Sequence, residues 1–209
     1  MIDVEVGQNL LWLFVFAAHH SLAARPFFKA WLTRFLPPHL ERLAYVLTSA
    51  LLLVLVLWQW RPLPTFFWQV ASPPGRLAVG ALFLLGLAIA LEGVRLTDGQ
   101  HLLGIRQIRD HRRGQRPVLP GLQTRSLYRW MRHPIMTGTL ILLWARPQMN
   151  GDHLLLALFF TGYIVVGTLL EERDLLTVHG EEYARYRREV PMFLPFNLLS
   201  IKKRKCSVL

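Results

Sequence analysis

The sequence predicts an all-α membrane protein, a polytopic bundle of about five transmembrane helices that forms one domain, residues 1–209. Hydrophobic residues make up 53% of the chain and charged residues only 18%, a balance more apolar than that of ordinary soluble domains. Several apolar runs also approach the roughly 20 residues with which a helix crosses a bilayer. This composition excludes a small soluble enzyme and a disordered basic protein, and the single cysteine excludes a disulfide scaffold.

The apolar runs follow one another along the whole chain. The candidate spans are residues 9–22, 43–58, 77–94, 135–144 and 154–170. The first and the fourth are shorter than a full span, so we expect flanking amphipathic residues to extend them. The third contains a single charge, Glu92, which precedes Arg95 by three positions and should pair with it at the helix end.

The basic residues predict the orientation of the bundle. Residues 24–42, 95–134 and 171–209 carry 21 of the 24 Lys and Arg residues. Because cytoplasmic connections are enriched in Lys and Arg, we place these three connections inside and the N-terminus outside. The net charge of +11 then reflects topology and anionic lipid, and it requires no nucleic-acid partner. Residues 196–209 form a basic tail. Cys206-Ser-Val-Leu near its end, after four basic residues, also resembles a prenylation signal, but we interpret it as part of a basic tail at the inner leaflet.

Two inner connections are expected to form helices. Residues 26–36 interleave aromatic and cationic side chains, which suits a helix lying in the membrane interface. Residues 171–190 place carboxylates before arginines and predict a cytosolic amphipathic helix that continues the last span. Gly180 marks a break within that helix.

Ionisable and polar residues beside the spans are the candidates for chemistry. The segment 97–108 is dense in hydrogen-bonding side chains, with apolar residues between them, so a solvated loop and a partly buried site are both compatible with it. His19 and His20 lie near the inner end of the first span. Adjacent residues point to different faces of a helix, so at most one of them faces the bundle, and an interfacial histidine is the alternative.

Two features near the last spans could bind a charged ligand. Pro134 suits the first turn of a helix, which leaves free N–H groups and a positive dipole beside Arg132, as an anion site requires. Glu171 and Glu172 end the fifth span and need water, a pairing partner or a bound cation. The sequence contains no nucleotide fingerprint, zinc-ligand spacing or serine nucleophile elbow, so we expect any cofactor to occupy an unusual helical site.

Two long motifs stand in the last third of the chain. They are Leu-Tyr-x-x-x-Arg-His-Pro-x-x-x-Gly at 127–138 and Glu-Glu-x-x-Leu-x-x-x-x-Gly-x-x-Tyr-x-x-Tyr-x-x-x-Val-Pro at 171–191. Together they resemble the isoprenylcysteine and phospholipid methyltransferase superfamily of membrane enzymes. Shorter motifs at 19–29, 41–47, 58–62, 102–107 and 170–175 resemble the bacterial methanethiol S-methyltransferases, and a related family linked to nitrite and nitric oxide reduction shares part of the pattern.

The resemblance implies S-adenosyl-L-methionine as the cofactor, bound on the inner side near the fourth and fifth spans. The positions that match cofactor contacts of the superfamily are Leu122, Gln123, Tyr128, His133, Pro134 and Glu171. Arg132 joins them because the carboxylate of the cofactor suits the predicted anion site. The ammonium and sulfonium groups of the cofactor suit Glu171.

The resemblance also implies methyl transfer to a small thiol, from methanethiol to dimethyl sulfide, with hydrogen sulfide as a further acceptor. A thiol such as cysteine has a pKa of about 8.5 and is mostly protonated at neutral pH, so a base or a cation is useful. Our candidates are His20, His101 and Arg106, with Gln100 and Gln107 beside the substrate. We expect membrane lipids as further partners, no metal, and an active site on the cytoplasmic side of the inner cell membrane.

Two alternatives stay open at this point. The same fold could methylate a lipid or a prenylated cysteine, although the arginine that contacts substrate in the isoprenylcysteine enzymes corresponds to Gly167 here. The chain could also lack methyltransferase activity, as a binding protein or as a relative of the sterol reductases, which share a similar C-terminal pattern but use a nicotinamide cofactor.

Overall fold

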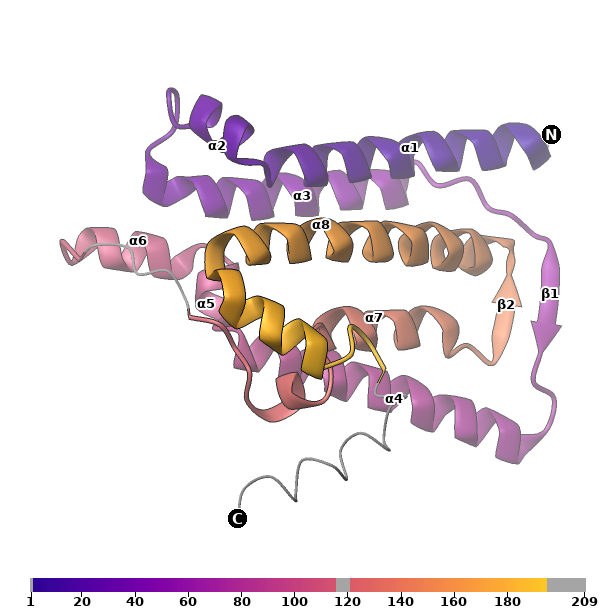
Figure 1. The fold of residues 1–209 in the computed structure, drawn as a ribbon. Coiled ribbons are helices and arrows are strands. Elements are labelled where there is room, and N and C mark those ends of the chain that lie inside the picture. Colours follow the sequence, from indigo (N-terminus) through magenta and orange to yellow (C-terminus); the bar gives the residue numbers. More distant parts are fainter. Residues whose placement is uncertain (1, 116–120, 195–209) are drawn as a thin grey trace, which may run out of the picture. The chain divides into compact units, whose positions relative to one another are not determined.

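The predicted spans form helices in the computed structural model, which describes residues 2–115 and 121–194 (Figure 1). They correspond to α1 (Ile2–Ala23), α3 (Glu41–Trp58), α4 (Pro73–Leu96), α7 (Pro134–Trp144) and α8 (Gly151–Glu189). Shorter helical elements are α2 (Pro26–Leu32), η1 (Pro38–Leu40), α5 (Gly99–Leu102), α6 (Ile105–Arg112) and η2 (Ser126–Arg129). The predicted basic tail, residues 196–209, lies outside the described residues.

The prediction of a purely helical fold is wrong in one respect. Strand β1 (Phe66–Gln69) pairs with β2 (Gln148–Asn150) in a small antiparallel sheet. The pairing joins segments that are far apart in the sequence, and each strand is too short to show a strand pattern of its own. Backbone hydrogen bonds between two connections therefore created an element that local periodicity does not reveal.

Within residues 2–115 and 121–194, three helices are long and apolar enough to cross a membrane. They cover Pro38–Trp58, Pro73–Leu96 and Gly151–Glu189, and we therefore treat the chain as a membrane protein. Helix α7 is apolar but has only 11 residues. The count of five spans and their orientation stay predictions.

Several local predictions are confirmed. Pro134 occupies the first turn of α7, and Arg95 donates two hydrogen bonds of 2.6 Å to Glu92. Helix α8 continues from the last span to Glu189, with non-helical backbone angles at Gly180 (φ 53°, ψ −128°). The predicted interfacial helix exists as α2 but is shorter than expected, because the chain turns after Leu32.

The described residues group into two compact units, each assembled from separate segments of the chain. Of the described residues, 2–70, 97–115 and 148–163 form the first unit, and 71–96, 121–147 and 164–194 form the second. Helix α8 contributes to both units, since the boundary falls after Tyr163. The single domain that the sequence predicts stays a prediction.

The core of the first unit joins α1, α3 and the beginning of α8. Leu13 and Phe16 of α1 and Val56 of α3 are buried together, and Phe159 of α8 packs against them. Asn9, which is fully buried, bonds both the backbone oxygen and the backbone nitrogen of Arg61 at 2.8 and 2.9 Å. This amide pairing fixes the connection after α3 against α1 without leaving a buried polar group unsatisfied.

In the second unit, α4 and α7 lie side by side (Figure 1) and approach closely through glycines. A Cβ atom built at Gly138 would lie 2.5 Å from the backbone oxygen of Gly86 and 2.6 Å from the backbone nitrogen of Ala90. Such small-residue contacts allow helices to pack tightly in lipid, where no hydrophobic effect drives their association. The seam holds the first turn of α7, and therefore Pro134, at a fixed position on α4.

We expect Gly138→Val to lower the free energy of unfolding by about 1–3 kcal/mol, because the added atoms must push α7 away from α4. The matched control is Gly80→Val on α4, where a Cβ atom meets nothing within 4 Å. Thermal unfolding of both variants in detergent measures the difference. Equal stability of the two variants would contradict the close packing of this seam.

Candidate functional site

A buried carboxylate, Glu172, lies at the centre of the polar residues of the second unit. Its side chain is only 4% exposed, and Nε and Nη2 of Arg132 each lie 2.6 Å from its Oε1 atom. The Nε2 atom of His133 lies 3.2 Å from the same oxygen. Two neighbouring residues before α7 are thus held to one carboxylate of α8, which receives the hydrogen bonds that a buried charge requires.

The guanidinium of Arg132 also donates hydrogen bonds to backbone oxygens. Its Nη1 atom donates to the backbone oxygens of Arg187, at 3.0 Å, and of Val190. The backbone nitrogen of Arg132 also donates to Pro191 at 2.9 Å. Arg132 therefore fastens the end of α8 and the chain that follows to the turn before α7, and its charge is not presented to an anion in the way that the sequence suggested.

Glu171 differs sharply from its neighbour. Its side chain is 53% exposed, and its Oε2 atom lies 3.8 Å from the Nδ1 atom of the His133 ring. The sequence left water, a pairing partner or a bound cation open for these two carboxylates. In the structure Glu172 is paired with Arg132, and Glu171 is exposed to solvent. The exposed carboxylate is thus the one available to a cationic ligand.

Three other residues of the predicted cofactor set also belong to this unit. The backbone oxygen of Tyr128, a buried residue, accepts a 2.6 Å hydrogen bond from the hydroxyl of Tyr186. The amide of Gln123 donates to the backbone oxygen of Leu96 at 3.0 Å. Pro134 is buried at the first turn of α7. These contacts fix the backbone of the connection between α4 and α7 around the start of α7.

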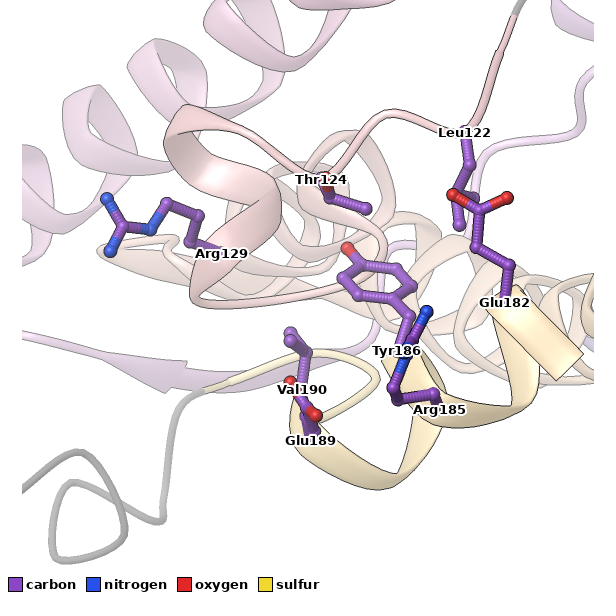
Figure 2. A pocket seen from close by; sticks show the side chains of 8 residues that line it. All are labelled: Leu122, Thr124, Arg129, Glu182, Arg185, Tyr186, Glu189 and Val190. Carbon is purple, nitrogen blue, oxygen red and sulfur yellow. The ribbon is translucent and has the colours of Figure 1, made fainter. Parts of the chain in front are cut away.

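A cavity of about 320 Å³ opens between this connection and the last turns of α8 (Figure 2). It is lined by Leu122, Thr124, Arg129, Glu182, Arg185, Tyr186, Glu189 and Val190. Its volume lies at the lower end of the range for small-molecule pockets, and of the predicted residues only Leu122 lines it. The sequence analysis missed the three charged residues from α8, although positions 182, 185 and 189 share one helix face.

The segment after α4 forms part of the first unit and is a partly buried polar element. Asp98 has a left-handed backbone (φ 57°) and caps α5, since its side chain accepts a hydrogen bond from the backbone nitrogen of His101. Arg106 lies 2.5 Å from the same carboxylate and 3.6 Å from that of Asp110. The bond to Arg106 lowers the pKa of Asp98, and the two carboxylates raise the pKa of Arg106.

The surroundings of His101 favour the neutral form of its imidazole. Partial burial lowers its pKa below 6.5, and the positive charge of Arg42 acts in the same direction. Beside it, the Nε2 atom of Gln107 donates to the backbone oxygen of His101 at 3.2 Å. The Oε1 atom of Gln107 is buried and has no hydrogen-bond partner among the described residues, whereas that of Gln100 accepts from Arg109 at 2.7 Å. Gln107 therefore offers an unused buried acceptor, whereas the exposed oxygen of Gln100 already accepts one hydrogen bond.

The two histidines near the end of α1 differ as expected. His20 lies between the hydroxyls of Tyr45 and Tyr163, whereas the ring of His19 is hydrogen-bonded to Thr48 at 3.1 Å. The predicted site residues thus form one group in each unit. The cofactor candidates lie in the second unit, and His20, His101, Arg106 and the two glutamines lie in the first.

Known proteins are similar in sequence to this chain along most of its length. A methanethiol S-methyltransferase of Mycobacterium tuberculosis is 48% identical over 199 residues, which covers 93% of this chain and 82% of that protein. A protein of the same name from Pseudomonas sp. is 40% identical over 203 residues and covers 92% of this chain and 78% of its own length. Nurim of Sus scrofa is 30% identical over 182 residues, 83% of this chain and 70% of Nurim.

No solved structure matches the chain. The model of the NnrU protein family matches residues 10–194, a range that includes both groups of candidate site residues. The chain therefore belongs to the NnrU protein family.

Proposed function

We propose that this chain is a membrane methyltransferase that transfers the methyl group of S-adenosyl-L-methionine to a small thiol. The expected reaction converts methanethiol to dimethyl sulfide, and hydrogen sulfide is a further acceptor. The observation that carries the proposal is the 48% identity, over 93% of this chain, to a protein named methanethiol S-methyltransferase. A methyltransferase needs a methyl donor, and the charged residues of the second unit are suited to S-adenosyl-L-methionine.

The second unit offers groups that match the charges of the cofactor. The exposed carboxylate of Glu171, beside His133, can bind an ammonium or a sulfonium group. The start of α7 at Pro134 can bind a carboxylate through its backbone N–H groups. Leu122, Gln123 and Tyr128 would contact the remainder of the molecule, and Arg132 would position the turn that carries His133. When bound, the cofactor supplies an electrophilic methyl group.

The first unit offers groups that can bind and ionise the thiol. His101, whose pKa is lowered by burial, could accept a proton, and the buried Oε1 atom of Gln107 can accept a hydrogen bond from a thiol. His20 is a second possible base. Arg106 is less available, because two carboxylates already share its charge. The geometry therefore favours a histidine over Arg106 as the group that ionises the substrate.

We also propose that the chain forms one domain with five spans, its N-terminus outside the inner cell membrane and its active site on the cytoplasmic side. The three long apolar helices and the short apolar α7 support the spans. The concentration of Lys and Arg in alternate connections supports the orientation. A small apolar thiol could reach such a site through the lipid.

The detergent-purified protein should bind S-adenosyl-L-methionine and not NADPH, and it should release dimethyl sulfide from methanethiol. Equilibrium binding and headspace gas analysis measure the two properties. Cofactor binding without a volatile product would indicate a lipid or prenylated acceptor. Binding of NADPH alone would overturn the proposal in favour of a reductase.

Replacement of Glu171 by glutamine should weaken S-adenosyl-L-methionine binding at least about tenfold, because a hydrogen bond to a charged group is lost. We expect His133→Ala to weaken binding as well. Glu181→Gln is the control, since Glu181 is an exposed carboxylate of the same helix. Titration calorimetry in detergent gives the three affinities, and parent-like affinity of the Glu171 and His133 variants would contradict this assignment.

Glu172, the carboxylate next to Glu171, should contribute to the stability of the fold. We expect Glu172→Gln to reduce the free energy of unfolding by about 3 kcal/mol, because the buried guanidinium of Arg132 loses its counter-charge. Glu171→Gln should change it by less than about 0.5 kcal/mol, as is usual for exposed positions. Thermal unfolding without cofactor compares the two variants, and similar stabilities would show that the pair does not divide its roles in this way.

A further inference from the structure

A row of partly buried hydrogen bonds in the first unit is centred on His20. The hydroxyl of Tyr45 lies 2.7 Å from Nε2, and the hydroxyl of Tyr163 lies 2.8 Å from Nδ1. The side chain of Ser21 extends the row, 3.1 Å from the hydroxyl of Tyr163. These groups come from α3, α1 and α8, so three separate helices place their polar atoms in one line.

The row lies among aromatic side chains. The ring of Phe16 lies 5.6 Å from that of His20, and the ring of Phe160 lies 6.4 Å from that of Tyr163, between centroids. Polar groups at such positions in membrane helices are costly, and proton relays are among their known uses. A purely structural link between helices requires one hydrogen bond, whereas both ring nitrogens of His20 are bonded here.

The chemistry of these groups allows a proton to pass along the row. A neutral imidazole donates from one nitrogen and accepts at the other, and a tyrosine hydroxyl both donates and accepts. A proton that enters at Tyr45 can therefore move to Nε2 of His20, while the proton on Nδ1 moves to Tyr163. Glutamine at position 20 could keep hydrogen bonds to the hydroxyls, but it could not take up a proton.

Arg42 contacts both Tyr45 and the polar segment that follows α4. The guanidinium of Arg42 lies 5.2 Å from the centroid of the Tyr45 ring, and its Nε atom donates to the backbone oxygen of Leu102 at 2.9 Å. The two segments of the chain are in close contact here, since a Cβ atom at Gly104 would lie 2.6 Å from the backbone nitrogen of Leu43. Arg42 thus connects Tyr45 to the segment that contains the substrate candidates.

We propose that Tyr45, His20 and Tyr163 form the relay that removes the proton of the thiol substrate, with Arg42 holding Tyr45 at its entrance. This assignment rests on the proposed methyltransferase function. The S–H bond of the thiol breaks, and its proton passes through Tyr45 to His20. The thiol sulfur forms a bond to the methyl carbon as the bond from that carbon to the sulfonium breaks. A thioether and an uncharged sulfide result, and the proton leaves to water through Tyr163 and Ser21.

The test compares two acceptors that differ in acidity. Methanethiol must lose a proton during the reaction, whereas methaneselenol is already ionised at neutral pH and needs no base. We expect His20→Gln and Tyr45→Phe to lower kcat for methanethiol about 100-fold or more, as is typical for loss of general-base catalysis. Both variants should methylate methaneselenol at about the parent rate.

The matched control is His19→Gln, which replaces the adjacent histidine outside the relay and should leave both rates unchanged. Tyr45→Phe removes a single oxygen atom, so it tests the relay even if His20→Gln does not fold, which thermal unfolding in detergent would reveal. Equal losses with both acceptors, or no loss with methanethiol, would overturn the relay. If the parent protein methylates neither acceptor, the proposed function itself is overturned, and the relay falls with it.

Discussion

The polar site of the second unit depends on one buried ion pair, between Arg132 and Glu172. The guanidinium is bonded to the carboxylate and to two backbone oxygens near the end of α8, so neither charge is left without partners. Breaking such a pair is far more costly than breaking an exposed one. The pair therefore determines where His133 lies, and it leaves the adjacent Glu171 exposed and available to a ligand. Two identical side chains that are adjacent in the sequence thus differ in the structure, since Glu172 is buried and paired and Glu171 is exposed.

The ion pair is effective because the start of α7 is itself held in place. Gly138 and Gly86 allow α7 to approach α4 so closely that a side chain at either position would collide with the partner helix. Helix α7 has only 11 residues, and a short helix with loose contacts could slide or tilt. Close packing on one side and the ion pair at its start together fix the backbone around Pro134, where the cofactor carboxylate is expected to bind.

The sequence predicted most helices, because their signals are local: long apolar runs, a proline at a helix start and a glycine break at Gly180. It could not predict the pairing of β1 with β2, which joins connections far apart in the chain. It also could not separate Glu171 from Glu172, since adjacent helical residues differ only in direction and the buried side depends on Arg132. The family resemblance, and not the spacing of residues, supplied the cofactor. The hydrogen bond from Arg42 to the backbone oxygen of Leu102 joins residues far apart in the chain, so the sequence pattern contains no signal for it.

Methylation of a thiol makes two separate demands on a protein. The methyl donor is a cation with an additional carboxylate and ammonium, so its site needs charged groups. The thiol is a weak acid in a mainly apolar surrounding, so its proton needs a path. In this chain the two sets of groups belong to different units, with the carboxylates in one and the histidine and tyrosines in the other. Under the proposed function, Glu171 would bind the cofactor and Tyr163 would belong to the proton relay, and both residues lie on the same helix, α8.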